Sequence, residues 1–359
     1  MSKPNVWVER GNDGNCAGST HHPAMDPWFA NKSDRNRSIR SPSLATFTPM
    51  RVTSKSSFWR TSTVGYSYRA LDKFIAPLVF INIYGVAVTS VNELITDLSI
   101  SQTFDSSHLF ALTTTLSLML VFRLSRAAVR WWDSRMMWGL IIAKCRQIGC
   151  RIVGFKGTDI NIESAESKRR RLEVLMDLVV FAVATRCYLR KVPVVASDLL
   201  GVVDKERVDR LNNTDHKVLV AGMDLSKRLV KLHEGKVDNP QLNVALEGKL
   251  KLVDDLVQTA GGLERIKNSP LPIIYTAHLR TFLLLYFLFF PFLVMGDLGW
   301  YTIPIIAVSS FVFLGVEGAA SDVDDGPFDG ARVNHVDVDG MVLRVMGDVE
   351  ICCKGLFED

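Results

Sequence analysis

Long apolar runs alternate with polar stretches along the 359 residues of this chain. An α-helix needs about 20 mostly apolar residues to cross the hydrocarbon layer of a membrane, which is about 30 Å thick. Four runs approach this length, at 72–94, 108–124, 274–295 and 300–317. A fifth run, 174–189, is shorter and contains Asp177 and Arg186, which is typical of a buried helix in a polar domain. The pattern therefore predicts an all-α membrane protein with four transmembrane helices.

Polar side chains interrupt the four long runs. The second and fourth runs are short and contain several Ser and Thr residues, and the third contains His278 and Arg280. Such residues rarely face lipid, because polar groups in hydrocarbon lack hydrogen-bond partners, and they usually face other helices or a water-filled space. We therefore expect the small and polar residues of these spans to be buried against other helices or other subunits. They include Ser117, Ser309, Ser310 and Gly315.

The distribution of Lys and Arg predicts the orientation of the spans. The loops 95–107 and 296–299 contain no Lys or Arg, whereas 1–57 and 125–272 contain many. Basic residues concentrate in loops on the cytosolic side of a membrane. Both termini and the long central segment are therefore expected in the cytosol, or in the stroma of a plastid. The pattern fits the plasma membrane and an organelle membrane equally well.

The segment between the second and third spans has helical periodicity, with apolar positions three and four residues apart and almost no strand-like alternation. It predicts a large cytosolic helical domain. The expected organisation is a disordered or loosely attached N-terminal arm at 1–57, two transmembrane helices including a pore helix at 58–124, the cytosolic helical domain at 125–272, two transmembrane helices at 273–320 and a cytosolic C-terminal tail at 321–359. The arm is rich in Arg and Ser, as organelle transit peptides are, and a plain cytosolic tail is the alternative interpretation.

Charge and cysteine content change this picture little. The formal net charge is +4, and the densest basic run, 168–171, is either a phosphate or anionic-lipid site or the solvated start of a helix. The six cysteines match no zinc-binding spacing, so we expect free thiols. The sequence contains no phosphate-binding Gly-rich loop after a strand and no nucleophile elbow, which argues against an enzyme. No nucleic-acid partner is expected.

One helix face near the second span is a candidate pore lining. Thr114, Leu118 and Phe122 recur every four residues and therefore share a face of an α-helix. Rings of such side chains around a common axis make a narrow apolar constriction that gates by dewetting, although the same spacing also suits packing between helices. Basic and aromatic residues follow and predict a membrane-interface anchor. They are Arg123, Arg126, Arg130, Trp131 and Trp132.

Three sequence blocks occur in the order and spacing of one channel family. They are 120-LVFRLSRAAVRWWDSRMMWG-139, 270-PLPIIYTAHLRTFLLLYFLFFPF-292 and 299-GWYTIPIIAVSSFVFLGVEGAASDVDDGPFDGARVNHVDVD-339. Together they resemble the bestrophin family over about 60 to 350. The resemblance implies a homopentameric channel in the lipid bilayer that passes monovalent anions, chloride or bicarbonate. It also implies a central pore whose apolar neck falls on Thr114, Leu118 and Phe122, with Thr114 making the outer ring wetter.

The segment after the fourth span departs from the pattern of animal bestrophins. Those proteins bind calcium with consecutive acids after a Pro-Phe pair, whereas here Pro327 and Phe328 are followed by 329-DGARVNHVD-337, as in bacterial, fungal and plant-type members. Asp322, Asp324 and Asp325 offer hard oxygen ligands, but their spacing does not match an EF-hand. They are therefore either a calcium site or an acidic turn that pairs with arginines. No other cofactor is expected.

Two further functions compete with an anion channel. A cation-conducting bestrophin homologue would place acids around the pore, and the stripe at 114, 118 and 122 has none. A membrane scaffold that conducts no ions is the other alternative. The sequence favours the anion channel, because helix N-termini near the pore would also attract anions.

Overall fold

The computed structural model describes residues 64–94, 106–154, 165–199, 203–233, 240–324, 326–330 and 335–357. The predicted arm at 1–57 lies outside the described residues. The described part is all-helical, as the sequence predicts. In chain order its elements are α5 (Val64–Leu94), α6 (Ser106–Gly154), α7 (Ala165–Arg190), η3 (Ala196–Leu199), α8 (Lys205–Asn212), α9 (Lys217–His233), α10 (Pro240–Asn268), α11 (Ile273–Leu298), η4 (Gly299–Tyr301), α12 (Thr302–Asp324) and α13 (Val338–Phe357).

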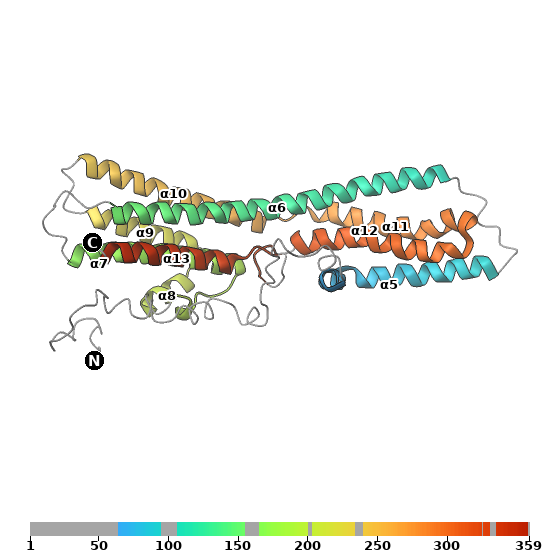
Figure 1. Cartoon of the computed structure of the whole chain (residues 1–359), viewed down its shortest axis with the longest axis horizontal. Coiled ribbons are helices and arrows are strands. Elements are labelled where there is room, and N and C mark those ends of the chain that lie inside the picture. The colour runs from blue at the N-terminus through green and yellow to red at the C-terminus, as the bar shows by residue number, and fades with distance from the viewer. Residues whose placement is uncertain are drawn as a thin grey trace.

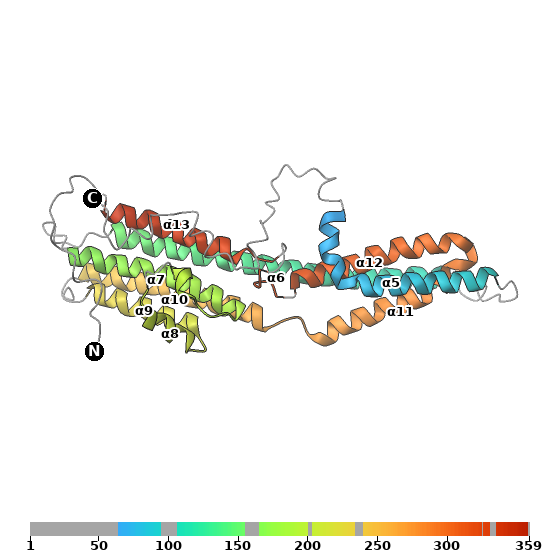
Figure 2. The same cartoon turned by 90° about the horizontal axis from the view of Figure 1, so that it is seen from below.

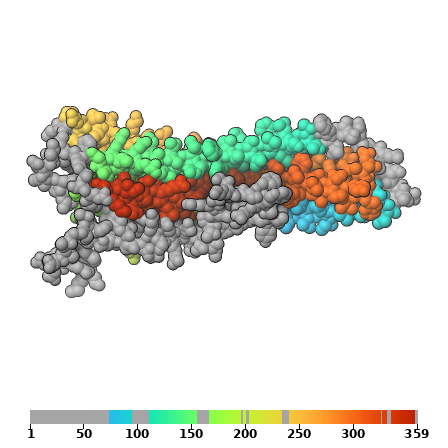
Figure 3. Space-filling view, in the orientation of Figure 1, coloured from blue at the N-terminus to red at the C-terminus, as the bar shows by residue number. Residues whose placement is uncertain are grey.

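The described part of the molecule is elongated, and α6 runs along most of its length (Figure 1 and Figure 3). Its 49 residues correspond to about 74 Å at 1.5 Å per residue. The helix can continue this far because its sequence contains no proline, which would remove a backbone hydrogen bond and clash with the preceding turn. It crosses position 124, the predicted boundary between the spans and the helical domain, without interruption. One helix therefore belongs to both halves of the molecule.

In the first half, α11 and α12 pack against the N-terminal part of α6, and α5 packs against α12 and α11 (Figure 2). Its core contains Phe74, Leu116, Leu120, Phe287 and Ile306. Among the described residues, three segments are long and apolar enough to cross a membrane: Phe74–Leu94, Ala111–Gly154 and Ile273–Asp324. The last of these holds both α11 and α12, which fold back on each other at η4, where Gly299 has a φ of +53°.

In the second half, α7, α10 and α13 pack against the C-terminal part of α6, and α9 packs against α7 and α10. Every residue from 174 to 187 in α7 is buried, which confirms that the fifth apolar run is a core helix. The two charged residues in that run are paired. Asp177 Oδ1 accepts a 2.6 Å hydrogen bond from Arg207 on α8, and Arg186 donates to Asp198 and Asp339.

Helix α13 belongs to the core of this second half. Residues 321–359 are expected from sequence as a tail, yet α13 packs along both α6 and α7. Its buried side chains recur at three- and four-residue spacing, as an amphipathic helix requires. They include Val338, Met341, Val342, Val345 and Val349. The chain end therefore completes the helical domain.

Candidate functional site

The N-terminal part of α6 has two different faces. Leu116 and Leu120 are 0% and 3% exposed and pack in the core formed with α5, α11 and α12. Leu118 and Phe122, on the other face, are each 56% exposed, and Thr114 is exposed as well. The structure thus brings the three predicted neck residues onto one open face of the helix. Packing within one chain does not account for this stripe.

The exposed apolar face continues along α6 into the second half of the molecule. Val121, Val129, Met136 and Leu140 are all exposed large hydrophobic side chains. From Leu118 to Leu140 the helix rises about 33 Å, and the final turns belong to the part of α6 that packs in the helical domain. Lipid covers only the part of a helix that lies in the membrane, so the remaining apolar side chains need another covering. An apolar face of this length is typical of a contact between subunits or of a wall around a shared axis.

A cluster of charged residues joins α6 to α12 at the boundary between the two halves. Arg123 is 2% exposed, and its Nη1 donates a 2.9 Å hydrogen bond to Asp324 Oδ2. Arg130 donates to the other oxygen of Asp324, and its Nη2 donates a 2.7 Å hydrogen bond to the carbonyl of Ile266. Arg123 Nε also lies 3.5 Å from Glu317 Oε2. These contacts fix the rotation of α6 about its axis.

Helix α11 joins the same cluster through Arg280. Its Nε donates a 2.8 Å hydrogen bond to Glu317 Oε1, and its Nη2 donates one of equal length to Ser321 Oγ. The sequence drew attention to Arg280 as a charge within a span, but not to its partner Glu317. The sequence did contain a signal for this partner. Glu317 is the last residue of the fourth apolar run, and an ionisable side chain at the end of a span requires a partner.

The predicted interface anchors are arranged differently in the structure. The Arg123 and Arg130 side chains point into the protein, toward the acids of α12. Trp131 is half-buried against the core of the helical domain, whereas Trp132 remains exposed. Arg126 is also exposed. Of this set, only Arg126 and Trp132 are oriented to meet lipid, water or another subunit.

The acids proposed as calcium ligands do not form a metal site among the described residues. Both carboxylate oxygens of Asp324 accept hydrogen bonds from arginines, Asp322 is buried, and Asp325 lies outside the described part of the chain. No group of three His, Cys, Asp or Glu residues in the described ranges is arranged to hold a metal ion. Among the described residues Asp324 pairs with the arginines of α6, and a calcium site at these three acids stays a prediction.

Polar residues within the spans meet other helices. Ser310 is fully buried, and its hydroxyl accepts a 3.2 Å hydrogen bond from Asn82 Nδ2 on α5. The hydroxyls of Thr113 on α6 and Tyr286 on α11 lie 2.8 Å apart. Ser117, Ser309 and Gly315 are partly buried. These contacts agree with the expectation that small and polar residues pack between helices.

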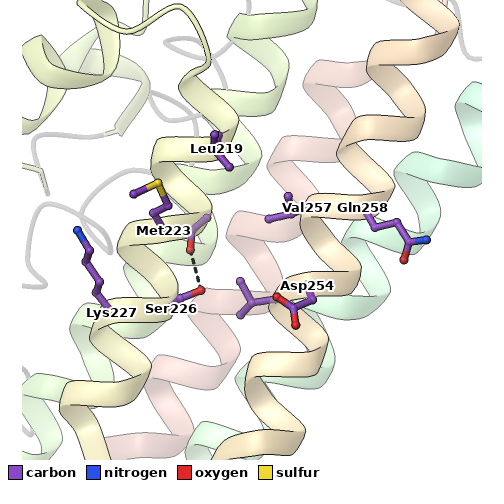
Figure 4. Close-up of a pocket in the computed structure, with 9 residues that line it drawn as sticks. Leu219, Met223, Ser226, Lys227, Asp254, Val257 and Gln258 are labelled. Atoms are coloured by element: carbon purple, nitrogen blue, oxygen red, sulfur yellow. Dashed lines mark hydrogen bonds between the residues drawn. The ribbon is translucent and has the colours of Figure 1, made fainter.

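A groove of about 560 Å³ lies between α9 and α10 in the helical domain (Figure 4). Leu219, Met223 and Val257 give it mostly apolar walls, and Ser226 Oγ donates to the carbonyl of Gly222 within its own helix at 3.0 Å. Asp254 and Lys227 are its charged residues. The lining contains no histidine or cysteine.

Comparison with known proteins shows which family has this architecture. Residues 50–350 match the family model of the bacterial and fungal bestrophin proteins. The chain belongs to the bestrophin family. This membership confirms the resemblance read from the three sequence blocks, and it accounts for the combination of apolar helices with a long helical insertion.

Several relatives of this bestrophin are named as anion or chloride channels. A voltage-dependent anion channel-forming protein of Nostoc is 28% identical over 268 residues, which is 75% of this chain and 83% of that protein. The chloroplastic voltage-dependent chloride channel 2 of Arabidopsis thaliana is 25% identical and covers 54% of this chain and 45% of its own length. The crystal structure of a bacterial bestrophin homologue from Klebsiella pneumoniae has a TM-score of 0.68 at 19% identity, covering 78% and 98% of the two chains. This last comparison establishes the shared fold.

Proposed function

We propose that this bestrophin assembles into a pentameric membrane channel that passes monovalent anions such as chloride or bicarbonate. The observation that carries the proposal is the open face of α6 with Leu118 and Phe122, which is unexplained by packing within one chain. Around a common axis, five copies of this face would form a narrow apolar neck. Water leaves such a constriction readily, so ions pass only when the rings widen or rotate.

The proposed subunit crosses the membrane four times, with α5, the N-terminal part of α6, α11 and α12. Support comes from the apolar core that these helices share and from the hairpin of α11 and α12 at η4. With both connecting loops free of Lys and Arg, the helical domain and both termini face the cytosol or stroma. In this arrangement the C-terminal part of α6 would line the vestibule below the neck.

Anion conduction is supported by the charges along α6. From position 106 to 132 the helix contains no Asp or Glu, and its first acid is Asp133. A cation pore usually presents a ring of carboxylates, which this stretch lacks. The names of the relatives point in the same direction.

Two measurements test the proposal together. The mass of the purified protein in detergent should correspond to five chains, and vesicles containing it should release chloride down a concentration gradient. A stable monomer, or an oligomer that passes no ions, would contradict the channel and favour a scaffold.

A further inference from the structure

We propose that Arg126 forms a ring of positive charge directly below the neck and determines the preference of the pore for anions. This inference rests on the proposed function, because it needs α6 to face the pore. It concerns one residue that was grouped by sequence with the membrane-interface anchors. In the structure Arg126 is exposed, whereas Arg123 and Arg130 pair with Asp324.

The position of Arg126 follows from the geometry of α6. It continues the four-residue series of Thr114, Leu118 and Phe122, one step of about 6 Å beyond Phe122. Like those residues, it is exposed in the single chain. If the stripe lines the pore, the Arg126 side chain enters the same space on the cytosolic side of the narrowest ring.

The charge of Arg126 is not neutralised by an acid of the described residues. Arg123 and Arg130, three residues before and four residues after it, both point to Asp324 on α12. In the described ranges no acid forms an ion pair with Arg126, and the nearest acid along α6 is Asp133, about 10 Å further on. A guanidinium group remains protonated at any physiological pH. Five copies would therefore give the pore five fixed positive charges below the neck.

Selectivity for anions needs a charged group, because the apolar side chains of the neck have no charge. Apolar side chains exclude anions and cations alike, since both lose their water there. A surface of one charge sign in a narrow, low-dielectric opening raises the local concentration of the opposite ion by about 10- to 1,000-fold. Arg126 supplies that sign where ions enter or leave the neck. The effect is electrostatic, so salt should screen it.

The test compares reversal potentials in planar bilayers for wild type, Arg126→Lys, Arg126→Gln and Arg126→Glu under a sodium chloride gradient. Arg126→Lys should keep the chloride-to-sodium permeability ratio. Arg126→Gln should lower it about tenfold at 0.1 M salt, and Arg126→Glu should make the pore prefer sodium. The matched control is Arg344→Gln, which removes an exposed arginine from α13, away from the stripe, and should leave the ratio unchanged.

Wild type alone provides a second readout. Its permeability ratio should fall as ionic strength rises from 0.1 M to 1 M, because the screening length shrinks from about 10 Å to about 3 Å. A selective channel whose ratio does not depend on salt would overturn the role of Arg126, and so would unchanged ratios in the Gln and Glu variants. These outcomes differ from failure of the proposed function, in which wild type itself passes no anions.

Discussion

The double change Leu118→Ala and Phe122→Ala separates a pore neck from a packing face. If the two side chains form apolar rings around a shared axis, truncation widens and wets the constriction, so the open probability should rise. The matched control is Leu116→Ala with Leu120→Ala on the opposite face of the same two turns. Those leucines are buried in the core shared by α5, α6, α11 and α12 and do not line the proposed pore.

The burial of the two pairs predicts different effects on stability. Replacing a fully buried Leu or Phe by Ala costs about 2–5 kcal/mol. Leu118 and Phe122 are each 56% exposed, so their truncation should cost only about 1–2 kcal/mol per site within the chain. Leu116 and Leu120 are 0% and 3% exposed, and the control pair should cost about 4–10 kcal/mol in total. That loss is comparable to the whole stability of a typical domain.

The assay records single-channel currents in planar bilayers and the thermal midpoint and oligomer mass of the same preparations in detergent. We expect the neck variant to assemble and to open more often, and the control variant to lose stability without opening more often. Wild-type gating in an intact neck variant would refute the assignment of this face to the pore. A neck variant that loses as much stability as the control, without added current, would indicate a packing contact.

Two further predictions concern buried charges. Asp324→Asn leaves Arg123 and Arg130 without their shared carboxylate. The thermal midpoint in detergent should therefore fall by the equivalent of about 3–5 kcal/mol. An unchanged midpoint would show that the cluster does not stabilise the protein. Burial and two neighbouring arginines lower the pKa of Lys249 to about 8, below its value of about 10.4 in an unfolded chain. The unfolded chain therefore binds more protons between these values, so stability should rise with pH from about 8 to 10.4, and Lys249→Met should abolish that rise. Equal pH profiles for the two proteins would contradict the buried, charged lysine.

The sequence predicted the helical class and the candidate stripe because both depend on local periodicity. The core helix at 174–189 was predictable because its length was too short for a span and it contained Asp177 and Arg186. The amphipathic pattern of α13 was also present in the sequence, but its partners are α6 and α7, far away along the chain. Periodicity shows that a helix has an apolar face without showing what covers it.

The charge cluster could not be predicted in the same way. A basic residue at the end of a span has the same local sequence whether it meets lipid headgroups or an acid on another helix. Arg123 and Asp324 are 201 residues apart, and only the packing of α12 on α6 brings them within 2.9 Å. Sequence therefore grouped Arg126 with Arg123 and Arg130, although its side chain lies on the exposed face.

The reversal potential of the wild-type channel under a tenfold sodium chloride gradient tests the central claim most directly. A pore that passes only chloride reverses near the chloride equilibrium potential, which is about 59 mV in magnitude for a monovalent ion. We predict a value close to this limit, with the sign set by chloride, and a similar current when bicarbonate replaces chloride. A reversal potential of the opposite sign would identify a cation channel, and the absence of current from an intact pentamer would contradict a channel of either kind.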